Sequence, residues 1–191
     1  MEVNTTAAKY AYSQGKIVIL DCGGRDDEIP EELLDNITYI SPNETELLRL
    51  DSSISLSEPI NLETLVEEVR NKLLTKRPNL RVLLKLGSKG SAIITKDTFV
   101  KGEVVTQINK NILNDYKIID TVGAGDCFTG AFAVKHSELD WSNAESSSSN
   151  YRSAMEFGNS AAFLCITQKG AMPSMPLREQ VNEFIAKYGI Q

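Results

Sequence analysis

The sequence predicts an α/β fold, because two kinds of hydrophobic pattern alternate along the chain. Short apolar runs, typical of strands, are separated by longer segments in which apolar residues recur at helical spacing. Glycine-containing turns follow two of the runs, at Leu86–Gly90 and at Asp120–Asp126. The chain has 191 residues, of which 41% are hydrophobic. We therefore expect one sizeable core and a single α/β domain over residues 1–191.

The first two thirds of the chain are expected to alternate helices with strands. The apolar run in Arg81–Leu86 favours a strand covered on both faces, and the Gly-Ser-Lys-Gly motif after it marks a turn. The expected elements are an opening helix up to Gln14, strands over Lys16–Leu20 and Ile37–Ile40, a helix after Pro42, a helix over Asn61–Thr75, strands over Leu80–Leu86 and Ser91–Thr95, and a hairpin-like pair around Thr98–Gln107.

The last third is expected to begin with a short buried strand, Tyr116–Asp120, and to close with three helices. The serine-rich tract Ser142–Asn150 is a low-complexity segment, and we expect a mobile loop there. The first of the three helices, Cys127–His136, is predicted by apolar residues at helical spacing, which are Phe128, Ala131, Phe132 and Val134.

The run Asp120-Thr-Val-Gly-Ala-Gly-Asp126 joins this strand to this helix and carries the main chemical signal. Gly123 and Gly125 lack a Cβ atom, so a ligand can approach the main chain closely. The N–H groups at the start of a helix form a site for phosphate, or for the charge that develops when phosphate is transferred. Asp126 is a poor phosphate ligand, but it is well placed to accept the proton of an attacking hydroxyl. The run therefore indicates phosphoryl transfer.

The residues alone leave a plainer interpretation of this run open. A Gly-x-Gly pair is common in strand-to-helix turns, and an aspartate in a first helical turn is usually a cap. The sequence contains no Gly-x-x-x-x-Gly-Lys-Ser/Thr loop, which excludes a P-loop enzyme. A dinucleotide-binding fold is also disfavoured, because Phe128 stands where its third glycine would be and the turn lies late in the chain.

Three further stretches accompany this run in the order of one enzyme family: Ile40–Leu50, Leu83–Ile94 and Phe157–Glu179. Together they resemble the ribokinase-like family of carbohydrate kinases, over nearly the whole chain from Gly15 onward. The resemblance implies a Rossmann-like, three-layer fold of the ribokinase type, with a sheet flanked by helices. It also implies the C-terminal, ATP-binding part of such a kinase, truncated at the N-terminus before the sugar contacts, the Gly-Gly hinge and the lid.

The resemblance assigns catalytic roles within the glycine turn. Asp126 would be the base that accepts the proton of the sugar hydroxyl. Gly123, Ala124 and Gly125 would supply N–H groups to the moving phosphoryl group, as preorganised donors. Removal of the base is expected to abolish activity without affecting the fold.

Asn43 and Glu46 lie three residues apart in the Pro42–Glu46 motif, on the same side of an expected helix start. The resemblance implies that they hold Mg²⁺ through water and order the phosphates of ATP. Oxygen ligands suit this hard cation, which keeps much of its water. Taken alone, the motif is equally a helix start with acidic residues favoured by the helix dipole.

The resemblance places the adenine nucleotide at the Gly-Ser-Lys-Gly turn. Gly87 and Gly90 would permit close backbone approach, Ser88 would offer a hydroxyl, and Asn159 would read an edge of the base. By composition alone the turn is an ordinary hairpin turn, and Asn159 is a polar residue on the solvent face of a helix.

Two positions depart from the family pattern. Lys85 stands where these kinases commonly have threonine, and it either adds a cation near the phosphates or points away. Cys22–Gly24 stands where they usually carry a proline-containing loop.

The segment Thr167–Ser174 resembles a loop that binds a monovalent cation in this family. Carbonyl and carboxylate oxygens suit such a hard ion. The implied K⁺ ligands are the carboxylate of Asp120, the hydroxyl of Ser174, and main-chain oxygens of Val122, Cys165, Gln168 and Gly170.

Composition limits the partners and the location. A net charge of -6 argues against nucleic acid or an anionic membrane. The apolar runs are too short to span a bilayer and no signal peptide is visible, so we expect a cytoplasmic protein. Three widely spaced cysteines suggest neither disulfides nor zinc. Among them, Cys127 is either a reactive thiol or a packing residue. The sole histidine, His136, is expected at the surface.

The activity implied by the resemblance is transfer of the γ-phosphoryl group of ATP to a primary hydroxyl of a pentose, foremost D-ribose, with Mg²⁺ and K⁺ bound. The full-length form is expected to be a homodimer. Alternatives are a related kinase for fructose or a nucleoside, and a non-catalytic nucleotide-binding fragment. A nicotinamide-dependent oxidoreductase is disfavoured by the late position of the glycine turn.

Overall fold

A computed structural model describes residues 1–24, 28–51, 53–54, 61–143, 145 and 147–190. The chain divides into two compact units. The first comprises Met1–Leu86 and Ala92–Phe99, and the second comprises Gly87–Ser91 and Val100–Gln191. Each unit has a hydrophobic core of its own.

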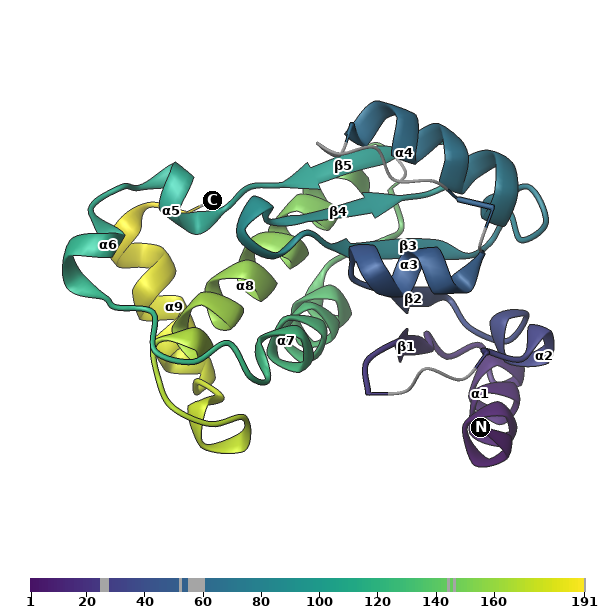
Figure 1. Ribbon diagram of the computed structural model, residues 1–191, viewed down its shortest axis with the longest axis horizontal. Helices are drawn as coiled ribbons and strands as arrows, with labels where there is room; N and C mark the ends of the chain where they lie inside the picture. Colours follow the sequence, from purple (N-terminus) through teal and green to yellow (C-terminus); the bar gives the residue numbers. More distant parts are fainter. Residues whose placement is uncertain (25–27, 52, 55–60, 144, 146, 191) are drawn as a thin grey trace. The chain divides into compact units, whose positions relative to one another are not determined.

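The strands form one sheet in the order β1-β2-β3-β4-β5 (Figure 1). β1 pairs with β2, and β2 with β3, in parallel. The connections from β3 to β4 and from β4 to β5 are too short for a crossover, so these pairs are antiparallel and the sheet is mixed. The bounds are β1 Ile19–Asp21, β2 Tyr39–Ser41, β3 Arg81–Lys85, β4 Ser91–Ile94 and β5 Phe99–Gly102.

Apolar residues of the helices and of the parallel strands form the core of the first unit. Ile40, Val82 and Leu84 of the strands are fully buried there, together with Leu47 and Leu74. The helices are α1 Glu2–Ser13, α2 Glu31–Leu34, α3 Glu44–Leu50 and α4 Leu62–Val69, which continues as the π-helical segment η1, Arg70–Leu74.

The second unit is built on two long helices, α7 and α8, which lie side by side in Figure 1. They approach closely at Gly158, where a Cβ atom would lie 2.9 Å from Cδ2 of Phe128. The helical elements are η2 Gly87–Lys89, α5 Val105–Ile108, α6 Ile112–Asp115, α7 Ala124–Glu138, α8 Ser147–Ile166, η4 Met172–Ser174 and α9 Arg178–Tyr188.

Most of the expected elements are confirmed with shifted ends. The opening helix, the strands β1 to β5 and the three closing helices are all present. Within the described ranges, no helix is both long enough and apolar enough to cross a bilayer.

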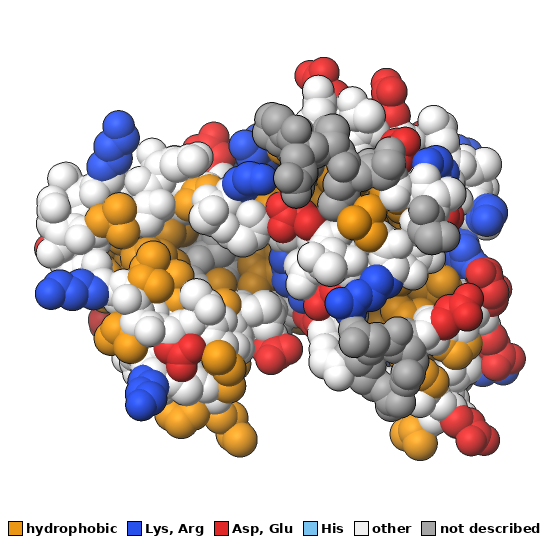
Figure 2. Space-filling view, in the orientation of Figure 1, with side chains coloured by type: hydrophobic (Ala, Val, Ile, Leu, Met, Phe, Trp, Pro, Cys, Tyr) orange, Lys and Arg blue, Asp and Glu red, His pale blue; other side chains and the backbone are white. Residues whose placement is uncertain are grey.

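The expected buried strand Tyr116–Asp120 is wrong. The segment is neither helix nor strand, and the side chains of Ile118 and Ile119 are 59% and 61% exposed. The amides of Ile119 and Asp120 donate to the carbonyl oxygen of Ile166, at the end of α8, instead of to a neighbouring strand. Figure 2 shows hydrophobic side chains at the surface of this unit around α5, α6 and α9.

Three further expectations are corrected. The second half of the expected hairpin-like pair is the helix α5, and the serine-rich tract enters α8 at Ser147. His136 is buried and not at the surface, because its ring stacks on Trp141 with the ring centroids 4.2 Å apart. The Nε1–H of Trp141 donates to the main-chain oxygen of His136.

Candidate functional site

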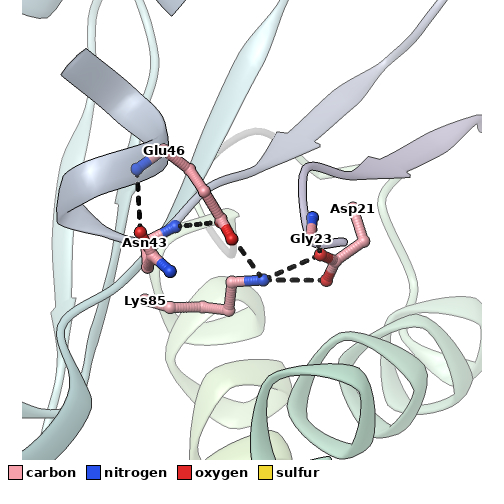
Figure 3. Close-up of polar contacts among 5 residues, drawn as sticks. All are labelled: Asp21, Gly23, Asn43, Glu46 and Lys85. Atoms are coloured by element: carbon pink, nitrogen blue, oxygen red, sulfur yellow. Dashed lines mark hydrogen bonds and ion pairs between the residues drawn. The ribbon is translucent and has the colours of Figure 1, made fainter. Parts of the chain in front are cut away.

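Charged side chains meet at the carboxyl ends of the three parallel strands in the first unit (Figure 3). Asp21 is the last residue of β1, Glu46 lies in the first turn of α3 after β2, and Lys85 is the last residue of β3. Ligands of α/β proteins bind at this edge of the sheet, outside the carboxyl ends of the strands. The arrangement is therefore a candidate for a polar ligand.

Asn43 and Glu46 form a capping box at the start of α3. The Asn43 Oδ1 accepts a hydrogen bond from the Glu46 amide at 2.8 Å, and the Glu46 Oε2 accepts one from the Asn43 amide at 2.7 Å. The plainer interpretation of this motif, a helix start, is thus present in the structure. The second carboxylate oxygen of Glu46, Oε1, lies on the side of Gly23.

Lys85 is directed at two carboxylates. Its Nζ lies 2.9 Å from both Oδ1 and Oδ2 of Asp21 and 3.9 Å from Oε2 of Glu46. All three side chains are largely shielded, being 13%, 24% and 14% exposed for Lys85, Asp21 and Glu46. Sequence reasoning missed Asp21, although an acidic residue directly after the predicted strand Lys16–Leu20 was the available signal.

A hollow of about 80 Å³ adjoins these carboxylates, lined in part by Leu20, Asp21, Gly23 and Glu46. It is far smaller than the roughly 300 Å³ at which ligand pockets begin. Burial, and then the charges of Glu46 and Asp21, raise the pKa of the Cys22 thiol to about 12. The thiol is therefore neutral at physiological pH and is not a nucleophile.

The turn between β3 and β4 depends on its two glycines. Gly87 and Gly90 have φ values of 53° and 91°, and the Gly90 amide donates to the Gly87 carbonyl oxygen at 3.2 Å. A Cβ atom on Gly90 would lie 2.5 Å from the carbonyl oxygen of Gly102. Ser88 is exposed at the tip of the turn. The turn thus presents main chain and one hydroxyl to solvent.

Asn159 of α8 contacts the segment that follows β5. Its Nδ2 donates to the carbonyl oxygen of Glu103 at 3.0 Å, and the side chain is half-buried. Gly102 fits against it, since a Cβ there would lie 2.7 Å from Oγ of Ser91 and 3.2 Å from Nδ2 of Asn159.

The glycine turn before α7 is held by Asp120. Its Oδ2 accepts from the Gly170 amide at 2.9 Å and its Oδ1 from the Val122 amide at 3.1 Å. These two bonds, the one from Gly170 first, hold the pKa of the Asp120 carboxyl below its usual range. The carboxylate therefore links the turn to the loop after α8.

Gly123 adopts the left-handed conformation that lets α7 begin at Ala124. Its φ is 83°, and a Cβ atom on it would lie 3.0 Å from Cα of Ala171. Asp126 is exposed in the first turn of this 15-residue helix. Among the predicted donors, the Ala124 amide already makes a long hydrogen bond of 3.3 Å to the Thr121 carbonyl oxygen. The amide of Gly125 lies beside it in the first turn.

Predicted ligands of the monovalent cation come together in the second unit. The Sγ of Cys165 lies 3.0 Å from the Ser174 hydroxyl and 4.0 Å from the Val122 carbonyl oxygen. The Ser174 hydroxyl donates to the Ala171 carbonyl oxygen at 2.7 Å. The main-chain oxygen of Cys165 accepts from the Gln168 amide at 3.2 Å.

Cys127 is buried in the first turn of α7. Burial, followed by the neighbouring Cys165, raises the pKa of its thiol to about 12. The packing interpretation of Cys127 therefore agrees with the structure better than the reactive one.

Comparison with known proteins identifies relatives of the whole chain. Residues 2–178 match the family model described as pfkB family carbohydrate kinase. The chain is 40% identical to the ribokinase of Arabidopsis thaliana over 186 residues, which cover 96% of the chain and 42% of that enzyme. It is 34% identical to the ribokinase of Staphylococcus aureus over 157 residues, which cover 81% and 43%.

A solved structure of Arabidopsis thaliana ribokinase with ribose and ATP superposes with a TM-score of 0.76 at 35% identity. The match covers 96% of this chain and 52% of that one. It confirms the predicted α/β fold, a mixed five-stranded sheet flanked by helices. The chain spans about half the length of these relatives.

Proposed function

Because the chain belongs to the pfkB family of carbohydrate kinases, we propose that it carries the nucleotide site and the catalytic base of an ATP-dependent sugar kinase whose acceptor is D-ribose. The observation that carries this proposal is the turn before α7. A left-handed Gly123 opens the helix, and Asp126 is exposed in its first turn. This combination offers main-chain donors for an anion and a carboxylate for a proton at the same helix start.

The proposed reaction uses the turn as follows. The sugar hydroxyl oxygen attacks the γ-phosphorus of ATP, the bond from that phosphorus to the bridging oxygen breaks, and ADP leaves. The hydroxyl proton passes to the Asp126 carboxylate. The amides of Gly123, Ala124 and Gly125 stabilise the charge on the transferred group, each contributing about 3–4 kcal/mol at most. Positioning of the hydroxyl and the γ-phosphoryl group supplies much of the remaining rate enhancement.

The nucleotide is proposed to lie at the turn between β3 and β4. Gly87 leaves the turn open to a base or ribose, because no heavy atom lies within 4 Å of the position of its Cβ, and Gly90 lets the turn pack against Gly102. Ser88 is exposed and can donate its hydroxyl. Asn159 holds the neighbouring Glu103 segment and places an amide group at the same border.

Two cations are proposed to accompany ATP. Oxygen atoms of Asn43 and Glu46 suit Mg²⁺ held through water, and the ion would neutralise phosphate charge. The carboxylate of Asp120 and the hydroxyl of Ser174 suit K⁺, since hydrogen bonds already draw the Asp120 turn and the Gly170 loop together. Main-chain oxygens of Val122, Cys165, Gln168 and Gly170 would complete that set. We also propose a cytoplasmic location and a homodimeric full-length form, on the resemblance alone.

A second candidate function is nucleotide binding without turnover. The observation that favours it is that the chain spans 42% of the Arabidopsis thaliana ribokinase that it matches. Fructose and nucleosides are alternative acceptors for the kinase itself. Fructose is tested as an acceptor because the chain is 34% identical to fructokinase-2 of Zea mays over 105 residues.

The test measures ADP formation from ATP and Mg²⁺ with D-ribose, D-fructose or adenosine as acceptor, using the wild-type chain and Asp126→Asn. We expect ribose-dependent turnover that the substitution lowers by ~10²–10⁴-fold, because a general base contributes that much. ATP binding without turnover would support the second candidate. A chain that neither binds ATP nor turns over would refute both.

A further inference from the structure

One of the two departures from the family pattern, Lys85, contacts the residue that directly precedes the other. Asp21 directly precedes Cys22–Gly24, which replaces a proline-containing loop, and Lys85 replaces a threonine. The Lys85 Nζ lies 2.9 Å from each carboxylate oxygen of Asp21 (Figure 3). Lys85 therefore forms an ion pair with a residue 64 positions away, at the start of the other departure.

Both partners are fixed at the main chain. The Lys85 amide donates to the Pro42 carbonyl oxygen at 2.8 Å, and the residue forms an isolated parallel bridge with Asn43. The Oδ1 of Asp21 also accepts from the Gly23 amide at 2.9 Å. A Cβ atom on Gly23 would lie 3.2 Å from this oxygen, so the loop leaves room for the carboxylate. The pair is built into the end of the sheet.

The direction of the ammonium depends on Asp21. An ammonium carries three N–H donors, and the two oxygens of Asp21 lie within hydrogen-bond reach. Glu46 lies at 3.9 Å, beyond that reach. Without Asp21, Glu46 is the nearest anionic partner among the described residues, and Lys85 would turn toward it.

On the nucleotide site proposed above, we infer that Asp21 is a positioning residue that orients the Lys85 ammonium toward a phosphate of the bound nucleotide. The third N–H of Lys85 then contacts a phosphate oxygen. Asp21 also holds the ammonium 3.9 Å from Oε2 of Glu46, the carboxylate proposed to serve Mg²⁺, which is beyond hydrogen-bond reach. The pair acts as one unit, since the lysine is misdirected without the aspartate and the aspartate repels phosphate without the lysine.

The charge of the cluster sets the expected loss of ADP affinity when Lys85 is replaced. Asp21, Glu46 and Lys85 together carry a charge of about -1, and loss of the ammonium makes it about -2 beside the proposed phosphates. A charge-assisted hydrogen bond in a shielded site changes affinity by about tenfold or more. We therefore expect about a tenfold loss of ADP affinity for Lys85→Met.

The experiment is a double-mutant cycle read with two ligands. The wild type, Asp21→Asn, Lys85→Met and the double variant are titrated calorimetrically with ADP and Mg²⁺, and with adenosine. We expect each single variant to bind ADP about tenfold more weakly. We expect the double variant to bind ADP no more weakly than Lys85→Met, because the carboxylate that repels phosphate is also gone. Adenosine affinity should stay unchanged because adenosine has no phosphate.

Three controls separate an effect of the Lys85 orientation on ADP affinity from a loss of stability and from a change of net charge. The amide side chain introduced by Asp21→Asn keeps an oxygen that can accept from the Gly23 amide, so thermal unfolding should change little. Lys187→Met removes the same charge from an exposed pair with Asp115, with 2.7 Å between Nζ and Oδ2, and should leave ADP affinity unchanged. Lys85→Arg should retain more affinity than Lys85→Met, because it keeps the charge.

Several outcomes would overturn the inference. Additive losses in the double variant would show that the two residues act independently, and an equal loss of adenosine affinity would show a merely structural role. Tighter ADP binding by Asp21→Asn would show that Asp21 competes with phosphate for the lysine. If the wild type binds ADP and both single variants bind it equally well, only this inference fails. If the wild type binds no adenine nucleotide, the proposed function fails with it.

Discussion

Replacement of Gly90 by alanine tests the turn that is proposed to bind the nucleotide. The residue has a φ of 91°, a conformation that costs an alanine about 1–2 kcal/mol. The added Cβ would also lie 2.5 Å from the Gly102 carbonyl oxygen, and such overpacking typically costs about 1–3 kcal/mol. We therefore expect Gly90→Ala to lower the free energy of unfolding by roughly 2–5 kcal/mol.

Gly87→Ala is the matched control in the same turn. Its φ is 53°, but no heavy atom lies within 4 Å of the added Cβ, so only the conformational cost of about 1–2 kcal/mol applies. Urea and thermal unfolding of both variants measure the difference. The steric part should place the Tm of Gly90→Ala roughly 2–12 °C below that of Gly87→Ala. Equal Tm values would refute the close packing of this turn against Gly102.

Three further predictions concern the second unit. Gly158→Ala should destabilise the protein by about 1–3 kcal/mol, because its Cβ would lie 2.9 Å from the Phe128 ring. Gly130→Ala, within α7 and with open space around its Cβ, should stabilise the protein by about 0.5–1 kcal/mol. Denaturant unfolding measures both, and the reverse order of stability would contradict the contact between α7 and α8. The lowered pKa of Asp120 means that its contribution is present above the unfolded pKa and lost as the pH falls through the folded one. The Tm of Asp120→Asn should thus lie below that of the wild type at pH 7 and approach it in acid, and a pH-independent gap would argue against the Gly170 bond. Burial raises the pKa of Glu156 to about 7, with Arg152 opposing, so wild-type stability should fall as the pH rises from about 4 to about 8. Glu156→Gln should remove that fall, and identical pH profiles of Tm would contradict it.

Local patterns predicted the elements whose own residues decide their structure. The apolar run that forms β3 is buried as expected, with Val82, Leu83 and Leu84 inaccessible. The segment Tyr116–Asp120 has a similar apolar run but is not a strand, and the amides of Ile119 and Asp120 bond to the end of α8. Whether an apolar run forms a strand depends on the segment that its amides can bond to, and the residues of the run do not specify that segment.

Long-range partners explain the site residues that were missed or misjudged. Nothing near Asp21 in the sequence indicates Lys85, 64 residues away, and the pairing follows only from the parallel order of β1, β2 and β3. His136 was misjudged for a similar reason, since its burial depends on Trp141 and Phe132 rings. By contrast, the glycine at position 123 is itself a local signal, because glycine adopts the left-handed φ of 83° found there without steric cost.

The most direct test of the central claim is a calorimetric titration of the wild-type chain with ATP and Mg²⁺, run beside the same titration with NAD⁺. We predict saturable binding of ATP with one nucleotide per chain, and no binding of the nicotinamide nucleotide. Absence of ATP binding by a chain that unfolds cooperatively, or binding of NAD⁺ in its place, would contradict the proposal that this chain holds the nucleotide site of a sugar kinase.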